Sequence, residues 1–182
     1  MKFNEFYSLT IVHSRDIILV KGVDYMNITK QKSQKTFDKQ AADYDTNIQG
    51  EHARKLYKPI IENLKNKNIH SILDLGCGTG ALLKEIKELN IAEQLFGIDI
   101  SPNMLEIAKN KLGNDATLIL GDSERLPFED SSFDAIVCND SFHHYPQPDI
   151  VEKEVSRCLK QNGVFIIGDC WQPIGARQIM NY

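Results

Sequence analysis

From about residue 70 onward, short continuously apolar runs alternate with longer segments in which apolar positions recur every three or four residues. The runs predict strands and the periodic segments between them predict amphipathic helices. Strands are expected at 71–75, 94–100, 116–122, 132–140 and 163–169, with helices at 80–90, 101–113 and 149–163. Apolar strands that alternate with helices indicate a parallel sheet covered on both faces. We therefore predict an α/β fold, a doubly wound Rossmann-like sheet of strand order 3-2-1-4-5.

Two further helices are predicted ahead of this sheet. The segment 35–45 places Phe37, Ala41 and Tyr44 on one helical face, and 51–68 contains Pro59, which is expected to kink or divide the helix. Residues 1–25 differ from the rest of the chain, because their apolar runs at 9–12 and 17–20 are rich in β-formers. We interpret 1–25 as an N-terminal appendage, 26–182 as the main domain, and 35–70 as its helical entry segment.

Composition narrows the class of protein. The chain has 182 residues, a formal net charge of −4 and 42% hydrophobic residues, as in a single globular domain. No basic tract suggests a nucleic-acid partner, and no apolar run reaches the roughly 18–20 residues that span a bilayer. The four cysteines have no metal-ligand spacing, so no metal is expected. We predict a cytoplasmic protein without a nucleic-acid or membrane partner.

The stretch "ILDLGCGTGALL" at 72–83 holds the most specific chemical signal. Gly76, Gly78 and Gly80 follow the first predicted strand and open a helix. With Ala81 they satisfy the loose dinucleotide fingerprint G-x-G-x-x-G/A, so a nicotinamide-dependent dehydrogenase is one candidate. Asp74 stands just before the glycines, however, and a phosphate-binding loop disfavours a negative charge there.

Acidic residues also stand at the carboxyl ends of all five predicted strands. In a parallel sheet these ends meet at one edge, which is where ligands bind. With ordinary composition, a given position is acidic about one time in eight, so acids at the ends of all five strands would rarely arise by chance. The residues are Asp74, Asp99, Asp122, Asn139 with Asp140, and Asp169.

Charge favours a cationic ligand over a dinucleotide at this edge. A carboxylate about 4 Å from a pyrophosphate costs roughly 1 kcal/mol per charge pair in water, and several times more when partly buried. A ligand that carries a sulfonium and an ammonium gains from the same acids. Its own carboxylate can use the backbone N–H groups that the glycines expose.

Four motifs in register resemble a known family. "DLGCGTG", "GIDISPNML", "GDSERLPFEDSSFDAIV" and "NDSFHHYPQP" look like the motifs of class I S-adenosylmethionine-dependent methyltransferases, most of all the small-molecule and quinone-type branch. The resemblance covers about residues 35–182. It implies that 26–182 is an S-adenosylmethionine-binding domain that transfers a methyl group, by in-line displacement, to a small-molecule acceptor.

The resemblance implies a role for the glycine loop. Gly76, Gly78 and Gly80 would line the methionine portion of the cofactor. Asp74 would act on its ammonium, directly or through water, and Asn139 would offer its backbone carbonyl, or its side chain as well, near the same ammonium.

It also implies the residues around the nucleoside. Asp99 would accept hydrogen bonds from both ribose hydroxyls, and Ile100 and Met104 would pack on the adenine ring. Asp122 would accept a hydrogen bond from the adenine amino group, with Ser123 beside it.

Helices before the sheet cover the cofactor in such proteins, which makes Phe37 and Tyr44 candidate lid residues, with core packing as the alternative. His143 and His144 follow the fourth strand, so either one is a candidate catalytic base. If this segment is extended, adjacent side chains point to opposite sides and only one histidine faces the cavity.

The C-terminus departs from the family pattern. Relatives continue past the fifth strand into a helix and a final antiparallel hairpin, which we expect this chain to lack, since it stops at Tyr182. A truncated or non-catalytic S-adenosylmethionine-binding protein is therefore an alternative, with the dehydrogenase a third. The methyl acceptor and the oligomeric state cannot be predicted from these residues.

Overall fold

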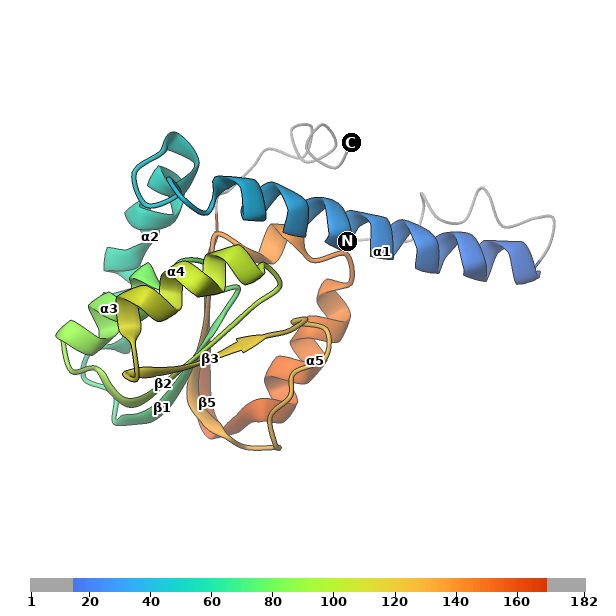
Figure 1. The fold of residues 1–182 in the computed structure, drawn as a ribbon. Coiled ribbons are helices and arrows are strands. Elements are labelled where there is room, and N and C mark those ends of the chain that lie inside the picture. The colour runs from blue at the N-terminus through green and yellow to red at the C-terminus, as the bar shows by residue number, and fades with distance from the viewer. Residues whose placement is uncertain (1–14, 170–182) are drawn as a thin grey trace.

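The computed structural model describes residues 15–169 and contains a five-stranded sheet (Figure 1). All neighbouring strands pair in parallel, in the order β3-β2-β1-β4-β5, which confirms the predicted topology. The strands are β1 (Ile69–Leu75), β2 (Ala92–Asp99), β3 (Ala116–Leu120), β4 (Phe133–Asn139) and β5 (Leu159–Gly168).

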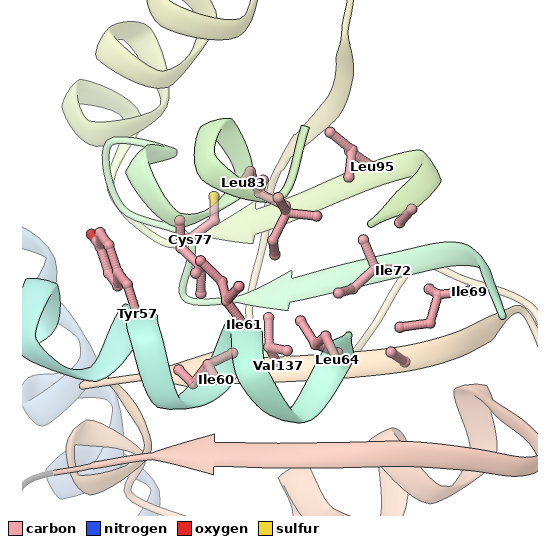
Figure 2. Packing of buried hydrophobic residues seen from close by; sticks show 14 of the residues in the cluster. Tyr57, Ile60, Ile61, Leu64, Ile69, Ile72, Cys77, Leu83, Leu95 and Val137 are labelled. Carbon is pink, nitrogen blue, oxygen red and sulfur yellow. The ribbon is translucent and has the colours of Figure 1, made fainter. Parts of the chain in front are cut away.

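Helices cover both faces of the sheet, as the continuously apolar strands predicted. They are α1 (Arg15–Gln40), α2 (Ile48–Leu64), α3 (Ala81–Glu88), α4 (Pro102–Leu112) and α5 (Pro148–Cys158), with a short 3₁₀-helix, η1 (Phe142–His144). Successive side chains of β1 point to opposite faces: Ile72 packs with α2 and α3, whereas Leu73 packs with α5. Figure 2 shows the first of these cores, where Ile61 and Leu64 of α2 lie over β1 and β4.

The signals at the ends of α4 act as predicted. Ser101 is its N-cap, and the Ser101 hydroxyl accepts a hydrogen bond of 3.1 Å from the backbone N–H of Met104. Pro102 occupies the first helical position and Gly113 ends the helix with φ 56°.

The predicted helix at 149–163 is wrong over its last turn. Helix α5 ends at Cys158, and residues 159–163 belong to β5. Leu159 pairs with Phe133, and the register then shifts before Val164 pairs with Ala135. Pairing with β4 therefore overrides the helical periodicity of this segment.

The entry helices also differ from their predicted bounds. Helix α1 begins at Arg15 and ends at Gln40, so the helix expected at 35–45 both starts and ends too late, and Tyr44 lies in the turn that follows. Pro59 lies inside an uninterrupted α2, so it does not divide that helix. Proline removes only one N–H donor from the helix.

Helix α1 crosses the boundary that was placed after residue 25. The run at 17–20, although rich in β-forming residues, lies within this helix. Residues 1–14, including the run at 9–12, and 170–182, including Cys170, lie outside the described residues. The division into 1–25 and 26–182 stays a prediction. In the part of the chain that the structure describes, no helix is both long and apolar enough to cross a membrane.

Candidate functional site

A cavity of about 920 Å³, counted with its open mouth, lies at the carboxyl ends of the strands beneath α1 and α2. The edge rule for parallel sheets places a ligand site here. Eleven of the twelve predicted cofactor residues line this cavity, and Gly80 does not. They are Phe37, Tyr44, Asp74, Gly76, Gly78, Asp99, Ile100, Met104, Asp122, Ser123 and Asn139.

Asp74, near the end of β1, is the most unusual group in the cavity. Only 2% of the residue is exposed, and its Oδ1 has no hydrogen-bond partner among the described residues. The neighbouring strand contributes a second such oxygen, Oδ1 of Asn139. Two buried acceptors without donors are costly unless a ligand supplies donors.

Burial, together with the charge of Asp99, raises the pKa of Asp74 to about 8. The carboxyl group is therefore mostly protonated at neutral pH in the ligand-free protein. The repulsion of phosphate expected from the sequence applies only to the ionised form. A cationic ligand favours that form, so the binding of a cation and the loss of a proton are linked.

Two glycines of the loop, Gly76 and Gly80, have different roles. Gly76 has φ 74°, and a Cβ there would lie 2.1 Å from Oγ of Ser141, so a side chain would collide with the cavity wall. A Cβ on Gly80 would lie 2.8 Å from Leu112 and 3.1 Å from Ala108 of α4. Gly80 thus permits α3 and α4 to pack closely, which explains why it does not line the cavity.

Asp99, at the end of β2, is held by the loops on either side of it. Its two carboxylate oxygens accept hydrogen bonds of 2.8 Å from the backbone N–H groups of Gly78 and Ser101. Burial raises the pKa of Asp99, although these hydrogen bonds oppose the shift. The carboxylate is fixed in orientation and retains acceptor capacity for a ligand hydroxyl.

Helix α1 and the turn after it are attached to the cavity rim by polar contacts. The Ser101 hydroxyl donates a hydrogen bond of 2.6 Å to Asp38 of α1. Asp45 accepts from the Thr79 hydroxyl at 2.5 Å and pairs with Lys111 at 2.7 Å. These contacts hold the segment that carries the two candidate lid residues over the glycine loop.

Both candidate lid residues line the cavity, and their rings meet edge to face with centroids 6.3 Å apart. Phe37 also contacts His144, with ring centroids 5.1 Å apart. Burial, then the charges of Asp140 and Asp99, raises the pKa of Tyr44 to about 12, so its hydroxyl stays protonated.

The two histidines have different surroundings. They lie in η1 rather than in an extended segment, but only His144 lines the cavity. Burial and the charge of His143 lower the pKa of His144 to about 4, so it is neutral. Burial lowers the pKa of His143, but Asp169, 2.7 Å from Nδ1, outweighs this and leaves it raised.

Asp140, His143 and Asp169 form a second cluster beside the cavity. One ligand atom of each lies within 4.8 Å of the others, which is close enough to hold a metal ion. The expectation that no metal is bound stays a prediction. Asp140 lines the cavity, whereas His143 and Asp169 do not.

Several lining residues were not predicted from the sequence. Tyr57 comes from the apolar face of α2, where its spacing indicates only burial. Lys30 comes from α1, and Glu124 follows Asp122 by two residues. The hydroxyl of Tyr145 accepts a hydrogen bond of 3.0 Å from Ser141. No spacing rule links these residues to the glycine loop, and the fold alone brings them together.

Comparisons with known proteins agree with this geometry. Residues 73–167, more than half of the chain, match the family described as "Methyltransferase domain". The sterol 4-C-methyltransferase strm-1 of Caenorhabditis elegans is 35% identical over 125 residues, which cover 65% of this chain and 36% of that protein. The demethylmenaquinone methyltransferase of Thermotoga maritima is 33% identical over 148 residues, covering 80% and 64%.

Solved structures share the fold. The YcgJ protein from Bacillus subtilis superposes with a TM-score of 0.62 and 28% identity, covering 68% of this chain and 53% of that one. The chain thus spans less than two thirds of the length of these relatives. The glycine loop, the acids at the strand ends and the matched segment lead to one conclusion: this chain belongs to the methyltransferase domain family.

Proposed function

We propose that the cavity binds S-adenosylmethionine and that the chain transfers its methyl group to a small-molecule acceptor. The observation that carries the proposal is the pair of buried acceptors beside the glycine loop, Oδ1 of Asp74 and Oδ1 of Asn139, which have no hydrogen-bond partner within residues 15–169. They fit an ammonium group, which has donors and a positive charge but no acceptor. A pyrophosphate offers acceptors and negative charge, so it would match neither Oδ1 of Asn139 nor ionised Asp74.

The remaining lining residues fit the other parts of this cofactor. Asp99, held by two backbone N–H groups, would accept from the ribose hydroxyls. Met104, which is 1% exposed, and Ile100 supply apolar surface for the adenine ring. Asp122 and Ser123 also line the cavity, and Asp122 would accept a hydrogen bond from the adenine amino group, with Ser123 beside it.

When bound, S-adenosylmethionine would supply a methyl group on a cationic sulfur. An acceptor nucleophile would attack the methyl carbon in line, and the sulfur would leave with the bonding electrons as a neutral thioether. The chain's residues align the reactants and exclude water. Phe37 and Tyr44 cover the cavity from α1 and the following turn. Neutral His144 lines the cavity and would accept a hydrogen bond from an acceptor hydroxyl, although its lowered pKa makes it a weak base for removing that proton. His143, bound to Asp169, lies behind it.

The small-molecule acceptor is supported by the relatives named for sterol and demethylmenaquinone methylation. The two relatives are named for different acceptors, so we propose only that the acceptor of this chain is a small molecule. The absence of a nucleic-acid partner also remains a proposal, supported by a net charge of −4 without a basic tract. A cytoplasmic location remains a proposal as well, supported by the free, buried thiols of Cys77, Cys138 and Cys158.

Calorimetric titration of the purified chain tests the proposal. We expect binding of S-adenosylmethionine and S-adenosylhomocysteine, no comparable binding of NAD, and weaker S-adenosylmethionine binding by Asp74→Asn. The matched control is Glu106→Gln, because Glu106 is an exposed acid on α4 outside the cavity. Tighter binding of NAD than of S-adenosylmethionine would contradict the proposal. Binding without turnover on any acceptor would favour the non-catalytic alternative.

A further inference from the structure

One cation lies in a cavity that otherwise presents carboxyl groups. Among the described residues that line it, Lys30 is the only Lys or Arg, whereas five carry carboxyl groups. These five are Asp74, Asp99, Asp122, Glu124 and Asp140. A cavity suited to a cationic cofactor therefore already contains a positive charge of the protein's own.

The Lys30 ammonium is held by two of these acids. Its Nζ lies 2.7 Å from Oδ2 of Asp122 and also donates to Oε2 of Glu124. The Lys30 side chain is 20% exposed and that of Glu124 is 8% exposed. Burial lowers the pKa of Lys30, but the hydrogen bonds and charges of Asp122 and Glu124 outweigh it and leave the pKa raised. Lys30 is therefore charged at neutral pH.

The two acids are fixed independently of α1. Oδ1 of Asp122 accepts a hydrogen bond of 2.9 Å from the backbone N–H of Glu124. Glu124 accepts from the backbone N–H of Gln147 at 3.2 Å and from its side-chain amide at 2.9 Å. The acid pair is thus built by the loops after β3 and η1, and Lys30 reaches it from another element.

The remainder of α1 has its own attachment to the rim. Asp38, two helical turns after Lys30, binds Ser101 and the side-chain amide of Asn103. Departure of the Lys30 ammonium from Asp122 therefore leaves the C-terminal part of α1 tied to α4.

We propose that Lys30 determines cofactor affinity by competing with the adenine amino group for Oδ2 of Asp122. The inference rests on the proposed function, in which Asp122 accepts from that amino group. The Lys30 ammonium binds Oδ2 of Asp122, whereas the backbone N–H of Glu124 binds Oδ1, and all three residues line the cavity. The charge of Lys30 also opposes a cationic ligand in the same cavity. Binding of the cofactor then displaces Lys30 from Asp122 while Glu124 retains it.

Removal of this charge is expected to tighten cofactor binding. Lys30→Gln should lower the dissociation constant for S-adenosylmethionine by about two- to fivefold. In the variant the ligand-free protein no longer has the partly exposed ion pair with Asp122 that binding must break. Lys30→Arg keeps the charge and should bind as the unaltered chain does. Lys35→Gln is the matched control, because Lys35 is an exposed lysine on the same helix and does not line the cavity.

A double-mutant cycle on S-adenosylmethionine affinity tests the competition. Calorimetry is run on the unaltered chain, Lys30→Gln, Asp122→Asn and the double variant, with circular dichroism to verify folding. We expect Lys30→Gln to tighten binding in the unaltered chain and to tighten it less beside Asp122→Asn, where only the repulsion between Lys30 and a cationic ligand is removed. Unchanged or weaker binding by Lys30→Gln alone, or equal tightening in both backgrounds, would overturn the competition.

The same cycle separates this inference from the proposed function. If Asp122→Asn weakens binding but Lys30→Gln does not tighten it, only the competition fails. If Asp122→Asn has no effect in the Lys30→Gln background, the adenine contact of Asp122 fails, and the competition fails with it. If the unaltered chain does not bind S-adenosylmethionine, the proposed function itself is wrong and so is the inference.

Discussion

Binding of S-adenosylmethionine should release a proton from Asp74. Burial and the charge of Asp99 raise the pKa of this carboxyl group to about 8 in the ligand-free protein. An ammonium beside it favours the carboxylate, so its pKa falls when the ligand binds. At pH 6.5 about 97% of the free protein carries this proton, so binding should release nearly one proton per site.

The sign of the pH dependence follows from the same linkage. The ligand prefers ionised Asp74, so affinity rises as the pH rises toward 8 and levels off above it. At pH 6.5 the proton must be removed first, which costs about 2 kcal/mol at 1.36 kcal/mol per pH unit. The observed affinity at pH 6.5 should therefore be about 30-fold weaker than that of the fully ionised site.

Isothermal titration calorimetry in buffers of different ionisation enthalpy measures the proton count directly. Asp74→Asn cannot ionise, so it should release no proton and its affinity should be nearly independent of pH from 5.5 to 7.5. An Asp74→Asn variant that binds and still releases a full proton would refute this account of the site. So would an unaltered chain that binds S-adenosylmethionine with no proton release.

Three substitutions and one comparison variant test the packing that positions the cavity, each by urea unfolding. Gly80→Ala should lower the free energy of unfolding by about 1–3 kcal/mol, because φ 72° and the contacts with α4 both oppose a Cβ. Gly78→Ala is the comparison, since its φ of 52° is also positive but a Cβ there would meet no atom within 4 Å, and it should cost about 1 kcal/mol; an equal loss at both sites would contradict the packing role. Ser101→Ala should cost about 1 kcal/mol through the lost cap of α4, and no change would show that the cap is dispensable. Leu83→Ala, at a fully buried position of α3, should cost about 2–5 kcal/mol, and a loss under 1 kcal/mol would contradict its place in the core.

Local sequence patterns predicted most of the fold but misplaced several boundaries. The capping serine and the terminal glycine of α4 act within a few residues, so its ends were predicted correctly. The end of α5 was not, because Leu159 pairs with Phe133, which lies far away in the sequence. The run at 17–20 is rich in β-forming residues, yet it lies within α1, because residue type alone does not determine secondary structure.

By itself the sequence determined the sheet order, the ligand-binding edge and the acids that stand there, because strand periodicity, glycine spacing and the position of Asp74 are local properties of the chain. Only the tertiary structure decided which groups share the cavity and in what state of charge. It buried Asp74 so that its pKa rises, turned His144 rather than His143 toward the cavity, and brought Lys30 onto Asp122. Desolvation and contacts between distant elements depend on packing in three dimensions, which no spacing along the chain encodes.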